Sequence, residues 1–134
     1  MSTALRIKNV KKDICNRIDI EKLVAEFYTK VKADELLGPV FTEVVRINWE
    51  KHMPLMCDFW ENAILFTGPY QGNPMDLHTH LHKAMPLQQL HFQKWNQLFI
   101  NTVDHLFTGE KALLAKQRAI KISEVLQSKI LDHK

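Results

Sequence analysis

The sequence has few glycines, no long apolar run, no internal repeat and no low-complexity segment. Its two cysteines, Cys15 and Cys57, are too far apart for a zinc ribbon or a disulfide framework. No apolar run approaches the ~20 residues that a membrane-spanning helix needs. The basic N-terminal residues lack the apolar core and cleavage site of a signal peptide. We therefore expect a cytoplasmic protein with no membrane partner.

The charge pattern and the missing motifs exclude other classes of protein. Lys and Arg number 18 against 15 Asp and Glu, which gives a net charge of +3, and the two signs alternate along the chain. Nucleic-acid binding is not expected from such a scattered surplus. The sequence also lacks a phosphate-binding glycine loop and a nucleophile-elbow motif. A nucleotide-binding enzyme and a serine hydrolase are thus unsupported.

The 134 residues, 46% of them hydrophobic, suit a single domain, with residues 1–17 as an N-terminal extension or pre-helix. Apolar residues recur at helical spacing almost throughout, and no strand pair is evident. We predict an all-α fold of five or six helices. Their ranges are 19–33 with Asp19 as N-cap, about 49–66 with Pro54 near its start, 74–83 opened by Pro74, a long helix to about 107, and 110–131.

Seven histidines occur, and three of them fall within five residues, at His78, His80 and His82. On a helix, His78 and His82 share one face while His80 points away. Three solvated histidines on a surface helix are one interpretation. Zinc would need further convergent ligands, which the neighbouring sequence does not offer. Heme iron needs only one neutral histidine beside an apolar slot, so the segment also suits a heme ligand.

Three other side chains carry a polar hydrogen on an apolar body: Tyr28, His52 and Trp95. Each alone also fits an ordinary structural role, in the core or near a helix start. Together they could converge as donors on one small polarised ligand in an apolar pocket. The middle of the chain supplies large apolar side chains for such a pocket, at Phe41, Met53, Met56, Phe59, Trp60, Met85, Phe92 and Phe99.

The order and spacing of these segments resemble the truncated hemoglobins, and within them the group III branch of these bacterial globins. The resemblance covers about residues 19–128, and the paired-glycine motifs typical of groups I and II are missing. The segments that carry it are Phe27-Tyr28-Thr29-Lys30-Val31, Leu37-Gly38-Pro39-Val40-Phe41, Trp49-Glu50-Lys51-His52 with Asp58-Phe59-Trp60, Tyr70-Gln71-Gly72-Asn73-Pro74 with His78, and His91-Phe92-Gln93-Lys94-Trp95 with Arg118-Ala119.

The resemblance implies a globin-like fold of two helices over two and a role for each matched residue. His78 would be the proximal ligand of the heme iron. Tyr28, His52, Trp95 and Met56 would form the distal side, where Tyr28 donates a hydrogen bond to the bound ligand. His80 and His82 have no assigned role. The remaining positions that would contact heme are Phe27, Phe41, Phe59, Trp60 and Phe92.

The function implied is reversible binding of O₂, and of CO, NO or cyanide, at heme b (iron protoporphyrin IX). Oxygen chemistry or defence against NO would suit strong retention of the ligand. Whether the protein is an enzyme stays open, because the same pocket could support peroxidase-like or NO dioxygenase chemistry with an external reductase. A heme-free helical interaction module is a further alternative. The oligomeric state is not indicated.

Overall fold

The computed structural model describes residues 11–40, 49–68 and 88–131. Within these ranges the chain forms helices and no strands, which confirms the all-α prediction. The helix predicted at 74–83 lies outside the described residues. The described helices are α2 (Arg17–Ala33), α3 (Trp49–Leu65), α5 (Gln89–Leu106) and α6 (Glu110–Leu131).

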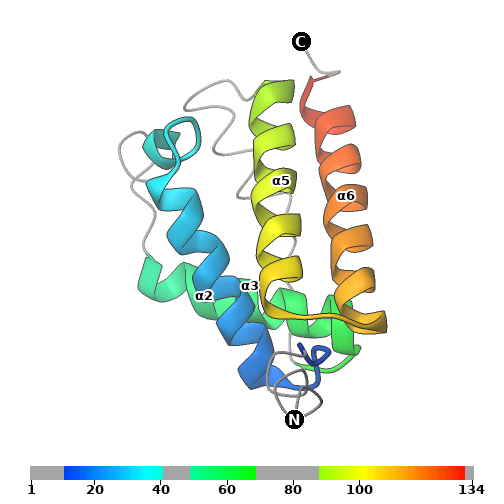
Figure 1. Ribbon diagram of the computed structural model, residues 1–134. Helices are drawn as coiled ribbons and strands as arrows, with labels where there is room; N and C mark the ends of the chain where they lie inside the picture. The colour runs from blue at the N-terminus through cyan, green and yellow to red at the C-terminus, as the bar shows by residue number, and fades with distance from the viewer. Residues whose placement is uncertain (1–10, 41–48, 69–87, 132–134) are drawn as a thin grey trace, which may run out of the picture.

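The four helices form two packed layers. The most extensive contacts join α2 to α3 and α5, and α6 to α5 and α3. Figure 1 shows α5 and α6 side by side, with α2 and α3 crossing each other in the second layer. The core therefore lies between the α2–α3 pair and the α5–α6 pair.

Helix α2 supplies one continuous apolar face to this core. The predicted face is confirmed, because all six of its residues are buried: Ile20, Leu23, Val24, Phe27, Tyr28 and Val31. The prediction of Asp19 as N-cap is wrong. The helix begins at Arg17, and Asn16 is the cap, since its side-chain oxygen accepts the Asp19 N–H at 3.1 Å. The Asp19 carboxylate instead accepts the Cys15 N–H and pairs with Lys12.

The start of α6 is capped by a residue from the opposite end of the chain. Both carboxylate oxygens of Asp13 accept backbone N–H groups, from Lys111 and Ala112, each at 2.8 Å. These are among the N–H groups that a helix leaves without an internal partner. Gly109 has φ +136, and a Cβ there would lie 2.5 Å from Asp13 Cγ. These hydrogen bonds hold the segment around Asp13, which precedes α2, against the first turn of α6.

Pro54 lies inside α3 and weakens its first turns. It is the sixth residue of the helix and so lies beyond the first four N–H groups, which have no internal partner in any helix. Proline cannot donate to the carbonyl four residues earlier, which here belongs to Glu50. The backbone ladder is therefore interrupted around His52, which lies between these two residues.

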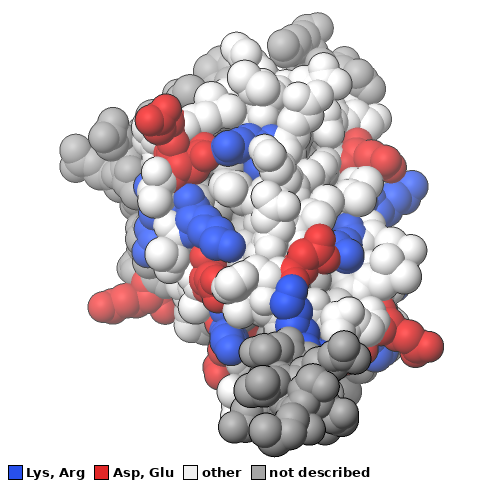
Figure 2. Space-filling view, viewed as in Figure 1, with Lys and Arg blue, Asp and Glu red and all other residues white. Residues whose placement is uncertain are grey.

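Ion pairs join the two helices of the α2–α3 layer, and charged side chains are spread over the surface. Arg17 Nη1 contacts Asp58 at 2.6 Å and Glu61 at 2.9 Å, which ties the start of α2 to α3. Figure 2 shows basic and acidic side chains interspersed over the viewed face. In the described ranges, none of the helices combines the length and the apolar character needed to cross a bilayer.

Candidate functional site

Tyr28 and His52 meet where α2 and α3 pack together. Their ring centroids are 5.5 Å apart and the rings are nearly perpendicular, at 81°. Only 3% of Tyr28 and 7% of His52 is exposed. Helical periodicity explains the burial of Tyr28, whereas His52 is buried in spite of its place in an early turn of α3. Although His52 is near the start of a helix, it is therefore not a surface residue.

Trp95 of α5 joins this pair through Phe27. The Phe27 ring lies 5.0 Å from Tyr28 and 5.4 Å from Trp95, edge to face in both contacts. Trp95 also stacks on Phe99, at 5.8 Å and 8°. The three predicted donors thus border one aromatic cluster, in which Phe27 contacts both Tyr28 and Trp95. Aromatic pairs in these arrangements stabilise the fold by about 0.5–1.5 kcal/mol beyond burial.

Among the other predicted pocket residues, Met56, Trp60 and Phe92 are buried and Phe59 is partly buried. Met56 and Phe92 are buried, with Met56 one turn after His52 on α3. Trp60 is also buried, and it stacks on Phe99 with centroids 4.6 Å apart, so it packs into the centre of the helical core. Phe59 points elsewhere, because it lines a cavity with residues of α6.

Burial sets the protonation of two groups beside the cluster. Burial raises the pKa of Tyr28 far above its ordinary value, and the neighbouring Cys57 adds to the effect. Tyr28 is therefore a neutral phenol, able to donate a hydrogen bond, throughout the physiological range. Burial also raises the pKa of the Cys57 thiol to about 11. A thiol that stays protonated is a poor nucleophile and a poor metal ligand.

His91 is a buried polar residue to which the sequence analysis gave no role. It lies one turn before Trp95 on α5, and its Nδ1 accepts the Gln88 N–H at 2.9 Å. That bond places the imidazole proton on Nε2. Among the described residues, Nε2 has no hydrogen-bond partner. The sequence offered one indication that His91 is buried, its i, i+4 spacing from Trp95. That spacing is common to many core positions and does not single out a functional residue.

Several predicted site residues lie outside the described ranges. These are His78, which would bind iron, Phe41, which would contact heme, and His80 and His82. Their predicted roles stay predictions. Within the described part of the chain, no group of three or more His, Cys, Asp or Glu side chains could hold a metal ion.

The described donors fit the environment of a small ligand bound to heme. A phenol, an imidazole and an indole are collected on one aromatic cluster, with a thioether nearby and without a carboxylate among them. Such a set presents polar hydrogens inside an apolar surrounding, where charge on a ligand is poorly screened.

The two-layer helical arrangement is the two-over-two form of the globin fold. The crystal structure of group III truncated hemoglobin from Campylobacter jejuni matches it with a TM-score of 0.78, over 90% of this chain and 95% of that chain, at 30% sequence identity. The fold and the buried cluster thus define a globin.

Curated relatives identify the family. The group 3 truncated hemoglobin ctb of Campylobacter jejuni is 30% identical over 122 residues, which are 89% of this chain and 94% of that protein. The group 1 truncated hemoglobin GlbN of Nostoc commune is 35% identical over 75 residues, 54% of this chain and 57% of that protein. No family model matches the sequence. The chain belongs to the truncated hemoglobins, in group III, and this membership implies a heme cofactor and diatomic ligands.

Proposed function

We propose that this globin binds O₂ reversibly at a heme b held by His78, and that Tyr28 and Trp95 retain the ligand. The heme supplies the iron centre at which a diatomic molecule binds. The observation that supports the proposal is the buried contact between Tyr28 and His52, at 5.5 Å, with Trp95 joined to it through Phe27. A heme-free helical module is disfavoured, because the family consists of heme proteins.

Tyr28 and Trp95 act as hydrogen-bond donors in this proposal. The Tyr28 hydroxyl keeps its proton because burial raises its pKa. O₂ carries more negative charge than CO when it binds to ferrous iron, so donors stabilise O₂ more. A hydrogen bond to a charged group contributes about 1.5–3 kcal/mol, and each such bond slows ligand escape by about one to two orders of magnitude.

His52 controls access in the same proposal. Its ring packs edge to face on Tyr28, and it lies on the turn of α3 that Pro54 weakens. A buried side chain on a loosened turn can move with little loss of helix hydrogen bonding. Met56 and Phe92 would exclude water from the pocket. Strong retention suits oxygen chemistry, sensing or NO defence, with an external reductase as partner, better than bulk delivery of oxygen.

Ligand dissociation rates test the proposed function. We expect the reduced protein to release O₂ at least about ten-fold more slowly than the Tyr28→Phe, Trp95→Phe double variant, which keeps both aromatic rings. CO release should differ much less between the two proteins. Equal O₂ release from both would contradict the proposal, and so would an equal effect on CO. Stopped-flow replacement of one ligand by the other measures both rates.

A further inference from the structure

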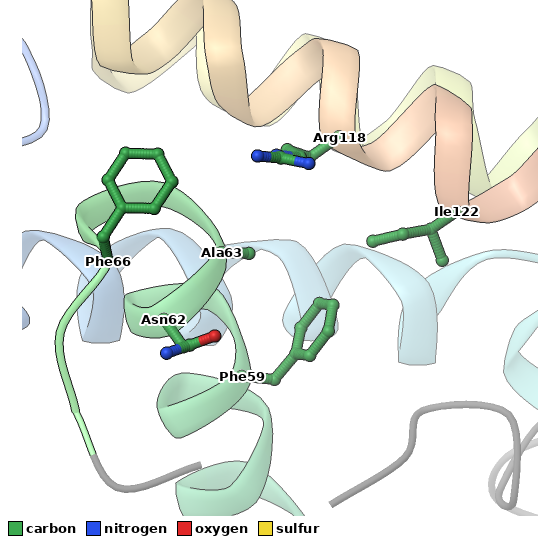
Figure 3. Close-up of a pocket in the computed structure, with 6 residues that line it drawn as sticks. All are labelled: Phe59, Asn62, Ala63, Phe66, Arg118 and Ile122. Atoms are coloured by element: carbon green, nitrogen blue, oxygen red, sulfur yellow. The ribbon is translucent and has the colours of Figure 1, made fainter. Parts of the chain in front are cut away.

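A second hollow lies between the end of α3 and the middle of α6, away from Tyr28 and His52. Its volume is about 330 Å³. Figure 3 shows the Arg118 guanidinium extending from α6 toward Phe66, with Phe59 and Ile122 facing each other across the same space. The residues that line it are Phe59, Asn62, Ala63, Phe66, Arg118 and Ile122.

The cavity begins where the distal cluster ends. Phe59 is its first residue on α3, about one turn beyond Met56. Phe66 follows Met56 by ten residues, which is about 15 Å along a helix. The far half of the cavity therefore lies well beyond the level of His52, and Phe59 lies at its near end.

Phe66 occupies a position that favours glycine. It follows the last residue of α3 with φ +61, in the left-handed region, and 62% of it is exposed. Helices commonly end at such a residue, and glycine is the usual choice because it lacks a Cβ. An exposed phenylalanine there gains little from burial. Strain of this kind is typical of functional positions, where the side chain is needed for a purpose other than folding.

Two cations flank this phenylalanine. Lys111 Nζ lies 4.7 Å from the Phe66 ring centroid, and Arg118 lines the cavity itself. Among the described residues, Arg118 has no carboxylate or other hydrogen-bond partner. The nearby carboxylate of Glu61 is already paired with Arg17, at 2.9 Å. Within the part of the chain that the structure describes, an anion at the mouth of the cavity would therefore be near two cations, Lys111 and Arg118, and near a Glu61 carboxylate that is already paired.

We propose that this cavity binds a small carboxylate with an apolar body, the chemistry of a medium-chain fatty acid. The aromatic and aliphatic walls would receive the chain, and Arg118 would bind the carboxylate through its planar fork of N–H donors. The volume lies at the lower end of the range for small-molecule sites.

Titration of the CO-bound heme protein with octanoate tests the proposal, with backbone amide shifts as the measurement. We expect saturable shifts along residues 59–66 and 118–122. Arg118→Gln should weaken octanoate at least about ten-fold. Lys121→Gln, which removes a cation from an exposed position of the same helix, should not weaken it. Octanol, which has no charge, should bind both variants equally.

The Phe66→Gly variant shows whether the Phe66 side chain serves ligand binding or the stability of the fold. Glycine suits the left-handed backbone at this position, so the variant should unfold at a urea concentration no lower than the wild type. Its affinity for octanoate should nevertheless fall several-fold, because one wall of the cavity is lost.

Three results would overturn the proposal. The first is no saturable octanoate binding, and the second is equal affinity in Arg118→Gln and Lys121→Gln. The third is an Arg118→Gln variant that loses hemin faster while it binds octanoate normally, since the cation would then serve a heme propionate. None of these results bears on the O₂ dissociation rates that test the proposed function.

Discussion

The His52 ring packs edge to face on the Tyr28 ring, with centroids 5.5 Å apart and an angle of 81° between the planes. The two residues come from different helices, α3 and α2, and both are buried. Because each ring fixes the position of the other, removal of either ring would disturb both polar groups. Substitutions that keep the aromatic ring of residue 28, or that leave its contact with His52 intact, therefore test the polar groups without disturbing the packing.

Tyr28→Phe removes one hydroxyl and keeps the ring contacts with Phe27 and His52. We expect the O₂ dissociation rate to rise by about ten- to a hundred-fold, since a donor worth about 1.5–3 kcal/mol is lost. CO dissociation should change far less. Thr29→Ala, at an exposed neighbouring position of α2, is the matched control. An unchanged O₂ rate in Tyr28→Phe would reject the donor role of this residue.

Trp95→Phe tests the second donor in the same way. Phenylalanine preserves an aromatic ring against Phe27 and Phe99 but has no N–H. The O₂ dissociation rate should rise in the single variant. Combined with Tyr28→Phe, its effect should be non-additive, because both donors serve one small ligand. Strict additivity in the double-mutant cycle would indicate that the two side chains act independently.

Pro54→Ala should restore the backbone hydrogen bond to the Glu50 carbonyl. We expect the free energy of unfolding to rise by up to about 3 kcal/mol, the cost of a proline in a helix interior. Amide hydrogen exchange should slow at residue 53 and in the following turn, 55–57, since the first four N–H groups of a helix have no internal partner, and ligand entry past His52 should slow as well. Leu55→Ala, at an exposed position next to the proline, is the control. Faster ligand entry in Pro54→Ala would contradict a gate that depends on a loosened turn.

Asp13→Asn should destabilise the protein by about 1–3 kcal/mol at neutral pH, because the amide has one acceptor oxygen and leaves the second backbone N–H of α6 without its partner. Burial alone would raise the pKa of Asp13, but the N–H groups of Lys111, Ala112 and Ile14 hold it below its ordinary value. A carboxyl with a lowered folded pKa stabilises above its unfolded pKa and loses this effect as the pH falls through the folded value.

The difference between wild type and Asp13→Asn should accordingly shrink below about pH 4, where an unperturbed Asp begins to take up a proton. Urea unfolding at a series of pH values measures it. Asp104→Asn is the control, because that exposed carboxylate pairs with Lys116 across the surface and caps no helix among the described residues. A difference that stays constant down to pH 2 would show that the carboxylate charge is not what caps α6.

Local patterns in the sequence predicted much of this fold. Apolar spacing gave the buried face of α2, and the range 110–131 coincides with α6. The cap of α2 was misassigned because Asn16 and Asp19 are equally good capping types, and only the backbone geometry separates them. The cap of α6 was not predictable, since Asp13 precedes Lys111 by 98 residues and no local pattern connects them.

The candidate site, too, could be predicted only in part from local sequence patterns. Residue type singled out Tyr28, His52 and Trp95, but only the crossing of α2 and α3 shows that His52 is buried against Tyr28. Likewise, Phe66 and Arg118 are unremarkable in the sequence. Their shared cavity exists because the end of α3 packs beside α6, a tertiary relationship that periodicity does not encode.

Titration of the purified protein with hemin, followed by absorption spectroscopy, tests the central claim most directly. We expect stoichiometric hemin uptake with a Soret band in the wild type and in His82→Ala. In His78→Ala, stable retention of hemin should be lost, because the iron has no protein ligand. A wild-type protein that stays colourless with hemin would contradict the account, and so would a His78→Ala variant that retains hemin as firmly as the wild type.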